Sequence, residues 1–529
     1  MNPAAALPAS LRKPADIIKR RDAAASRKEL WRSLYRETYD YFMPQRETFN
    51  TYAPGQRKDF HLFDSTGQEC IYSAANTAQS LLCPSWKNWA LLAPGGDIKP
   101  EEAESQEVID KLQETTETIF NYVNHSNFST VVPEIFLDLM VGTGAMTVEE
   151  GDMEEPLLHD CVPLSALELE EGPNGSIKTE FQKHSVTARN LTQMFRGMTL
   201  ESLPQKLQDK IRKQPDSKID IIRGCIYVPE TRQYYGVVVD AEASGILWSH
   251  NYGLTSPYIV ARSSVTAGEI YGRGPAIWAL PDMKTLNAMV EFMLSVGALQ
   301  AAPPMTAVTD SVMNPYTTSL IPNTVIPVGS NDSGNPSLRV LEVGGNFNIT
   351  EKLIFEQRQR IRRIMLGEMG HEGPVKSPTE WMIHDRNRTR EQGSVYGRIQ
   401  SEFLSPYMTR VVAILGKMGK VPPLKINGKQ ITLKYVSPLA RAQDDEDLLS
   451  LQKSLEILMP LGPEAIAASL KVESIGRFVA RKTGLDADLA RTEEETQKIV
   501  EAAGQAAAPP APAPQGGGNV AQLPGRRAA

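Results

Sequence analysis

Lysines directly follow glycines at several places in this sequence, and Gly-Lys pairs occur in loops that bind nucleotide phosphates. A loop that wraps nucleotide phosphates needs a glycine five residues before a Gly-Lys pair and a hydroxyl directly after it. Three Gly-Lys pairs lack both features: Gly416-Lys417, Gly419-Lys420 and Gly428-Lys429. The turn Gly272-Arg273-Gly274 is a poor dinucleotide-binding motif, because Ile277 stands where its third glycine is due. The sequence therefore indicates no nucleotide-binding loop.

Metal and nucleophile chemistry have equally weak support. The acidic run at 444–447 could bind a metal ion for phosphoryl transfer, but acids at the N-terminus of a helix explain it without metal. His371 and His384 have no partner ligands nearby in the sequence. Ser333 lies in an Asn/Gly/Pro-rich turn without a positioned histidine. We therefore expect no catalytic residue, no metal site and no cofactor.

Composition favours a folded protein of a reducing compartment. The chain has 529 residues, of which 41% are hydrophobic and 22% charged, which is enough for two or more cores. Its net charge of −7 argues against a surface that binds duplex DNA from outside. Four cysteines without CxxC spacing predict buried thiols: Cys70, Cys83, Cys161 and Cys225. No apolar run approaches the roughly 18 residues that span a bilayer, so we expect no membrane partner.

The stretch 257–305 organises the rest of the chain. A short strand begins at Tyr258, and a loop with three glycines follows it. Pro281 predicts the first turn of a helix over residues 281–300, since proline is tolerated there. Seven apolar residues are expected to form one broad stripe on this helix: Met283, Leu286, Met289, Val290, Met293, Val296 and Leu299. A helix of this length is about 30 Å long.

A second helix is predicted after Asn348, over residues 350–366. Asn348 is a candidate N-cap with Glu351 three residues later, and glycines follow the helix. The two helices bracket residues 303–347, where prolines and β-favouring runs at 320–328 and 338–343 predict a small strand-containing lobe. The sequence therefore predicts a helical hairpin whose two helices are connected by this lobe.

The rest of the N-terminal half mixes helices with short strands, which predicts an α+β fold. Helices are expected at 15–43, 65–82, 101–124, 132–141, 187–195 and 203–212. Strands are expected at 89–92, 145–149, 157–162, 166–170, 177–181, 218–228, 234–240 and 245–248. Asn174-Gly175 predicts a hairpin turn.

A glycine-rich loop is predicted at 367–376. Its expected hinges are Gly367, Gly370 and Gly373. Ser377 and Glu380 supply the N-cap and N3 residues of a capping box, which fixes the far end of the loop. The helix that follows is expected to reach about residue 418 with a kink at Pro406. Short helices are predicted over 444–496, and the Ala/Pro/Gly-rich segment 505–529 is expected to be disordered.

Four blocks of the sequence follow one another in a recognisable order: LWRSLYRETYDYFMP, VGTGAMTVEEG, PYIVARSSVTAGEIYGRGPAIWALPDMKTLN and PTEWMIHDRNRTREQGSVYGRIQSEFLSPYMTRV. Taken together, they resemble the head-to-tail connecting (portal) proteins of short-tailed, podovirus-type bacteriophages. The third block is the most specific, and the resemblance covers roughly residues 15 to 500. The low-complexity C-terminal end departs from the pattern, which leaves the architecture of that end open.

The resemblance implies a portal-type fold with an α/β wing, a two-helix stem, a small strand-containing clip, a long kinked wing helix and a helical crown. It divides the chain into 1–262, N-terminal helices and strand-rich wing; 263–302, loop and first stem helix; 303–347, clip; 348–366, second stem helix; 367–376, tunnel loop; 377–420, kinked wing helix; 421–443, strand-containing connection; 444–504, helical crown; and 505–529, disordered tail.

The resemblance also implies a homo-oligomeric ring, expected to be a dodecamer, through which double-stranded DNA is packaged and ejected. The implied partners are the terminase, a tail adaptor, and the major capsid and scaffolding proteins. The implied place is the capsid portal vertex of the virion, after assembly in the host cytoplasm. His371 and Lys376 of the tunnel loop would face the DNA. An acidic exterior and lumen would let a polyanion slide without being held.

Two other functions stay open on the sequence alone. A minor capsid or internal scaffold protein would be structural without a DNA channel, and electron microscopy of the purified protein separates it from a ring. A packaging ATPase or nuclease is disfavoured because the phosphate-binding loop is missing, and an ATPase assay tests it.

Overall fold

The computed structural model describes residues 7–50, 55–84, 87–95, 106–195, 197–241, 245–301, 305–307, 338–340, 347–366, 397–422, 425–426, 429–435, 438–461, 475–476 and 479. The fold is mixed α+β, as the sequence predicts. The chain divides into two units, Met1–Leu439 and Ala440–Ala529.

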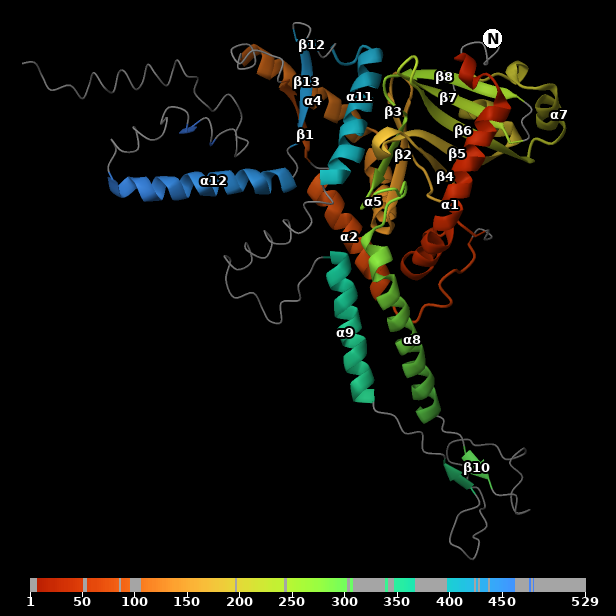
Figure 1. Cartoon of the computed structure of the whole chain (residues 1–529), viewed down its shortest axis with the longest axis vertical. Coiled ribbons are helices and arrows are strands. Elements are labelled where there is room, and N and C mark those ends of the chain that lie inside the picture. Colours follow the sequence, from red (N-terminus) through yellow and green to blue (C-terminus); the bar gives the residue numbers. More distant parts are fainter. Residues whose placement is uncertain are drawn as a thin grey trace, which may run out of the picture. The chain divides into compact units, whose positions relative to one another are not determined.

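Four helices dominate the N-terminal part of the first unit (Figure 1): α1 (Pro14–Phe42), α2 (Thr66–Leu82), α4 (Gln106–His125) and α5 (Phe128–Val141). The predicted helices at 15–43 and 65–82 are confirmed. The start predicted for α5 at residue 132 is wrong, because Pro133 lies inside the helix rather than in its first turn. At that position proline gives up one backbone hydrogen bond, and buried Phe128 and Val132 pack the helix against the core.

A three-stranded antiparallel sheet lies beside α5. Its order is β3 (Leu157–Cys161), β2 (Thr143–Glu150) and β9 (Tyr258–Arg262). The register places Thr143 opposite Arg262, so the first residue of β2 meets the last residue of β9. This sheet therefore brings the start of the strand-rich region against the stretch that leads into the next long helix.

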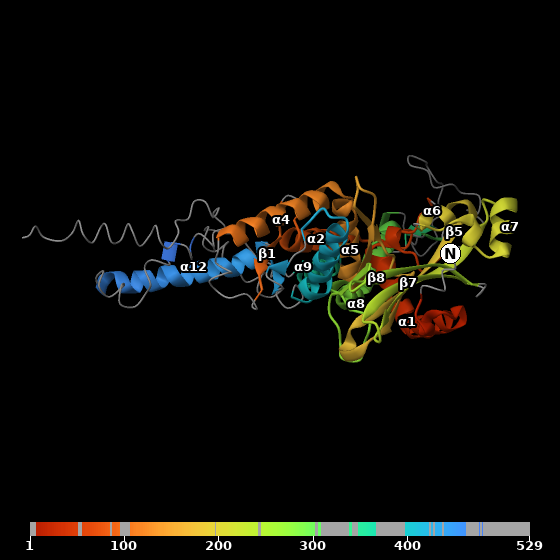
Figure 2. The ribbon, with the colours of Figure 1, turned by 90° about the horizontal axis from the view of Figure 1, so that it is seen from above.

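A five-stranded antiparallel meander forms the second sheet: β4 (Leu167–Glu171), β5 (Ile177–Thr187), β6 (Lys218–Val228), β7 (Gln233–Asp240) and β8 (Ile246–Gly253). Gly175, with a φ of +69°, confirms the predicted hairpin turn between β4 and β5. The N-terminal half of α1 covers one face of this sheet (Figure 2). The short helices α6 (Leu191–Met194) and α7 (Gln205–Lys213) belong to the core on the other face.

Two long helices, α8 (Pro275–Ala301) and α9 (Phe347–Leu366), pack side by side as the sequence predicts (Figure 1). The predicted start of α8 at Pro281 is wrong: the helix begins at Pro275, and Pro281 lies inside it. Gly274 ends the preceding loop, so Pro275 takes the favoured first position instead. Asn348 is not an N-cap, because α9 begins one residue earlier, at Phe347.

Between these helices the structure describes one strand pair, β10 (Met305–Ala307) with β11 (Leu338–Val340). It confirms a strand at the start of the predicted run 338–343. The other predicted run, 320–328, lies outside the described residues.

A π-helix, Gln400–Leu404, runs directly into α11 (Ser405–Lys417). The irregularity predicted at Pro406 therefore exists, but it takes the form of a wide helical turn just before the proline, which has no N–H to donate. Farther along, β13 (Lys429–Tyr435) lies between β1 (Ala90–Pro94) and β12 (Lys425–Ile426). The C-terminal part of the first unit thus returns to strand β1, near residue 90.

The helix α12, Pro438–Leu458, lies almost wholly in the second unit. It corrects the interpretation of the acidic run 444–447, which lies in the second and third turns and not at a helix N-terminus. Macrodipole stabilisation fades within the first turn, so it does not explain this run.

The principal hydrophobic core joins α1, α2, α5, α8, α9 and α11 with the three-stranded sheet. Trp89, Tyr35 and Tyr407 are among its largest fully buried side chains. Among the described residues, no helix combines the length and the hydropathy that crossing a membrane requires.

Candidate assembly site on the paired helices

Just before α8, the backbone of the loop lies directly against the backbone between α5 and β2. We call this contact the joint. Gly142, between α5 and β2, lies against Gly272: a Cβ atom placed on either glycine would come within 2.2 or 2.3 Å of the other's carbonyl oxygen. Gly274, which precedes α8, has the carbonyl oxygen of Met140 at 2.1 Å from the equivalent point. Side chains do not fit at such distances, so these three positions require glycine.

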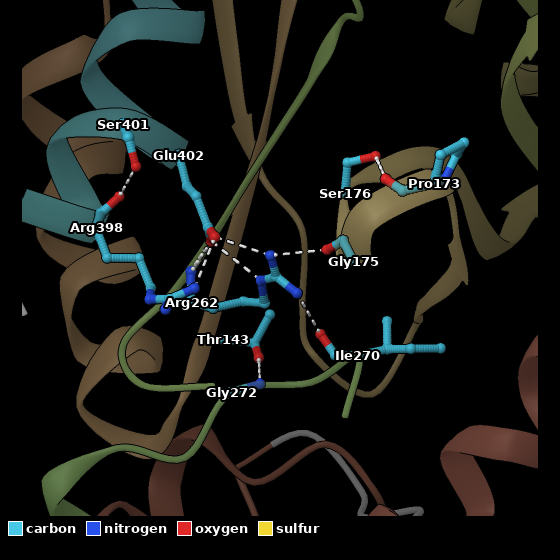
Figure 3. Close-up of polar contacts among 10 residues, drawn as sticks. All are labelled: Thr143, Pro173, Gly175, Ser176, Arg262, Ile270, Gly272, Arg398, Ser401 and Glu402. Atoms are coloured by element: carbon cyan, nitrogen blue, oxygen red, sulfur yellow. Dashed lines mark hydrogen bonds and ion pairs between the residues drawn. The ribbon is translucent and has the colours of Figure 1, made fainter. Parts of the chain in front are cut away.

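Hydrogen bonds close the same joint. The Tyr35 hydroxyl, on α1, donates to the carbonyl oxygen of Gly272 at 2.7 Å. The Gly272 amide donates to Thr143 Oγ1 at 2.9 Å (Figure 3), and the Gly274 amide donates to the carbonyl oxygen of Val141 at 2.8 Å. Three elements, α1, β2 and the end of α5, therefore hold the loop before α8 in place.

Polar contacts also fasten the paired helices to the N-terminal segment. Asn287, buried on α8, accepts a hydrogen bond from the Phe63 amide at 2.7 Å and donates one to the carbonyl oxygen of His61 at 3.0 Å. Arg358, on α9, donates to Asp64 at 2.8 Å. Burial acts to raise the pKa of Asp64, but hydrogen bonds from Thr66 and from Arg358 outweigh it and lower that pKa.

Arg262, the last residue of β9, connects four segments (Figure 3). Its backbone amide and side chain bind both carboxylate oxygens of Glu402 in the π-helix, and its guanidinium also donates to the carbonyl oxygens of Ile270 and Gly175. Arg398, one turn before Glu402, donates to the same carboxylate at 3.3 Å. This charged cluster ties the helical residues 397–404 to β9, to the β4–β5 turn and to the loop before α8.

A second polar contact anchors α11 from its buried side. His159 Nε2 lies 3.1 Å from the Tyr407 hydroxyl, and its Nδ1 lies 3.0 Å from Asn127 Oδ1. Because the amide oxygen can only accept, Nδ1 carries the proton and Nε2 accepts from Tyr407. Burial lowers the pKa of His159 to about 4, so the ring is neutral at physiological pH.

Buried polar side chains fill the space between the sheet β3-β2-β9 and the five-stranded meander. Arg223, on β6, pairs with Glu149, on β2, and the Tyr252 hydroxyl donates to the same carboxylate at 3.1 Å. Glu180, on β5, is almost fully buried and accepts from the Ser256 hydroxyl at 3.4 Å. Burial raises the pKa of Glu180 to about 8, so this carboxyl is protonated at neutral pH.

A groove of ≈ 850 Å³ lies beside the Arg262–Glu402 cluster and contains several carboxyl groups. Glu402 and Glu269 are already bound to arginines, and Glu180 is protonated. Across the described part of the chain, no group of three or more His, Cys, Asp or Glu side chains is placed to hold a metal ion.

The surface of α8 is apolar on two opposite sides. Met283 and Leu286 are fully buried, whereas Trp278, Phe292 and Leu299 are 50%, 71% and 46% exposed. At about 100° per residue, these three exposed residues fall within about 60° of one another on the side opposite Met283. The single broad stripe predicted for this helix is therefore wrong, because Leu299 lies on the outer side. We call Trp278, Phe292 and Leu299 the outer stripe.

The helix α9 adds further exposed apolar surface and a cluster of cations. Ile349, Leu353 and Phe355 are 59%, 42% and 60% exposed near its N-terminal end. Its last ten residues, 357–366, contain four arginines and no acidic residue. An apolar side of a helix is normally buried against another element, so the exposed outer stripe indicates a surface that a partner covers.

The residues predicted from the sequence to face DNA or to shape the loop all lie outside the described residues: Gly367, Gly370, His371, Gly373, Lys376, Ser377 and Glu380. Their roles stay predictions. Sequence reasoning missed the Arg262–Glu402 cluster, for which no local signal exists. The outer stripe has no sequence signal of its own, because at 100° per residue Trp278 shares the angle of Val296, and Phe292 lies about 20° from Leu299, both members of the predicted stripe.

Known proteins share the sequence pattern of most of this chain. The profile of the family described as bacteriophage head to tail connecting protein matches residues 15–490. The portal protein of Salmonella phage epsilon15 is 22% identical over 515 residues, which cover 92% of this chain and 90% of that protein. The probable portal protein of Bordetella phage BPP-1 is 20% identical over 448 residues, covering 81% and 79%.

Two solved structures are also similar at low scores. The virion of the native gene transfer agent (GTA) particle has a TM-score of 0.34 with 11% identity, covering 83% of this chain and 97% of that one. The neck of the empty GTA particle computed with C6 symmetry has a TM-score of 0.33 with 11% identity, covering 85% and 99%.

Proposed function

Since this chain belongs to the family of bacteriophage head to tail connecting proteins and is a portal protein of the virion, we propose that it acts as a closed ring of identical subunits with a central channel for double-stranded DNA. The expected ring is a dodecamer. It would stand at one capsid vertex, pass the genome inward during packaging and outward during ejection, and act without catalysis of its own.

The observation that carries the ring is the outer stripe of α8. A closed ring uses two different surfaces of each subunit, because every copy contacts one neighbour with each side. The outer stripe supplies one apolar surface, and the exposed residues Ile349 and Leu353 of α9 supply a second. Packing the stripe of one copy against α9 of the next would remove both from water. At roughly 25 cal/mol per Å² of apolar surface, such burial in every copy favours assembly.

The parts of the fold take the following roles in this proposal. The helices α8 and α9 are the stem, and the lobe 303–347, with its β10–β11 pair, is the clip. The loop 367–376 is the tunnel loop, and the helix that contains residues 397–417 is the long wing helix. The sheet β3-β2-β9 and the five-stranded meander form the wing, and residues 444–504 form the crown.

The partners of the ring follow from its place between head and tail. The clip would meet the terminase during packaging and the tail adaptor afterwards, and the wing would meet the major capsid and scaffolding proteins. Assembly would take place in the host cytoplasm. The net charge of −7 suits a channel that releases DNA readily, because each phosphate held by a cation adds to affinity and slows movement.

Electron microscopy and native mass spectrometry of the full chain test the ring. We expect rings with a central hole from the native sequence and their loss in Phe292→Glu, which buries a charge in the proposed contact. Met153→Glu is the matched control, because Met153 is 65% exposed in the turn between β2 and β3. Monomers or filaments from the native sequence would favour a minor capsid or scaffold role. Rings that persist in Phe292→Glu would exclude the outer stripe as the contact.

A further inference from the structure

The C-terminal half of α9 concentrates positive charge in a chain that is otherwise acidic. Residues 357–366 contain Arg358, Arg360, Arg362 and Arg363 and no acidic residue, whereas the whole chain carries −7. The sequence-based expectation of an acidic lumen placed the few relevant cations on the loop at 367–376. The structure places four of them on a well-formed helix before that loop.

Two of these arginines are neutralised by the body of the protein. Arg358 is bound to Asp64 at 2.8 Å, and Arg360 lies 3.4 Å from Asp282 of α8. For Arg362 and Arg363, no acidic partner occurs among the residues that the structure describes. Within the part of the chain that the structure describes, two positive charges at the end of α9 are therefore not paired with an acidic side chain.

The helix geometry directs these charges away from the core. Ile361 and Met365 are buried, and at about 100° per residue Arg363 lies about 160° away from each of them. Arg362 lies about 100° from Ile361, on the flank of the helix. Arg363 is exposed and Arg362 is half-buried. Both guanidinium groups can therefore reach a ligand outside the subunit.

The helix macrodipole explains only part of this pattern. Cations in the last turn of a helix are stabilised by about 0.3–1 kcal/mol, which accounts for Arg363. It does not account for four arginines within the final ten residues, nor for the lack of any acidic residue among them. A helix whose only role was to pack on α8 would need no such charge.

We propose that Arg362 and Arg363 contact the phosphate backbone of double-stranded DNA at the channel wall, a role that rests on the proposed channel function. Arg363 is followed after three residues by Gly367, where the proposed tunnel loop begins. Four residue steps span at most about 14 Å of extended chain, so Arg363 stands within about 14 Å of the first residue of that loop. A ring multiplies the two charges by its subunit number. Phosphate contacts of this kind carry no sequence information and weaken as salt rises.

Binding of a short fluorescent DNA duplex to purified rings, measured by anisotropy across a salt series, tests this role. We expect the double variant R362E/R363E to form rings and to bind the duplex more weakly. The slope of log Kd against log salt should fall by about 0.9 for each phosphate that the ring no longer binds. The neutral variant R362Q/R363Q should give an intermediate reduction in affinity.

The matched control is R212E/K213E, which reverses two neighbouring exposed cations in the last turn of α7. Equal reductions in affinity in the two charge reversals would show non-specific attraction and overturn the proposal. Unchanged binding in R362E/R363E rings would overturn it as well while leaving the ring intact. If neither variant at 362 and 363 assembles, the arginines serve assembly and the proposal is wrong. Absence of rings from the native chain would instead reject the proposed function itself.

Discussion

Arg262 and Glu402 lie 140 residues apart in the sequence and are joined by three hydrogen bonds, from the Arg262 backbone amide, Nε and Nη2, at 3.0, 3.1 and 2.8 Å. The Arg262 side chain is 7% exposed and that of Glu402 18%. Because the pair is largely withdrawn from water, each charge depends on the other for its solvation. The pair thereby attaches the π-helix, and the long helix behind it, to the last residue of β9.

Glu402→Gln should lower the free energy of unfolding by about 3 kcal/mol, because it leaves the Arg262 guanidinium buried without its counter-charge. Urea denaturation of the full chain measures the loss. Arg398→Gln is the control: Arg398 is 39% exposed and binds the same carboxylate, so its removal should cost less than about 1 kcal/mol. Equal losses from both variants would show that burial of Arg262 is not the cause.

Gly142→Ala should prevent normal folding, because its Cβ would come 2.2 Å from the carbonyl oxygen of Gly272, where neither backbone can yield. Gly297→Ala is the matched control within α8, since nothing lies within 4 Å of its added Cβ. That control should gain up to about 1 kcal/mol from the higher helix propensity of alanine. Thermal melts monitored by circular dichroism distinguish the two. A Gly142→Ala protein that melts like the native one would refute the close-packed joint.

Acidification should weaken the contact between α11 and β3 through His159. Its pKa is lowered from 6.5 to about 4 in the folded protein, so its contribution is complete above pH 6.5 and is lost as the pH falls through 6.5 toward 4. The full loss amounts to about 3 kcal/mol, at 1.36 kcal/mol per pH unit. His159→Gln should show a shallower fall in unfolding free energy between pH 7 and pH 4. Parallel curves for the two proteins would contradict this assignment.

A rise in pH, in contrast, should lower the free energy of unfolding through Glu180. Its pKa is raised from 4.5 to about 8 by burial, so its contribution is complete below pH 4.5 and is lost as the pH rises toward 8. Glu180→Gln removes the ionisable group and keeps its shape. We expect this variant to match the native protein near pH 4 and to exceed it by a few kcal/mol at pH 9. Denaturant titrations at the two pH values provide the comparison, and a variant less stable at both would count against a protonated Glu180.

Local patterns determined the helices and strands, because the period of apolar residues and the turn-forming glycines act within a few residues. The helices at 15–43 and 65–82, the hairpin turn at Gly175 and the pairing of two long helices were all predictable on that basis. The four blocks of sequence also led to the family, which the match over residues 15–490 shows. The predicted start of α8 is wrong because Pro275 and Pro281 both fit a first turn, and the helix begins at Pro275, directly after Gly274 in the close-packed loop.

Tertiary structure alone decided the contacts between distant segments. No feature of the sequence around Arg262 identifies Glu402 as its partner. The pairing depends on how the folded chain brings β9 against the π-helix, 140 residues farther along the sequence. The outer stripe of α8 has the same origin: Met283 and Phe292 are equally apolar, and burial separates them only once the body and α9 have covered one side of the helix. Hydrophobicity is a property of each residue, whereas the side of a helix that stays open is a property of the packing around it.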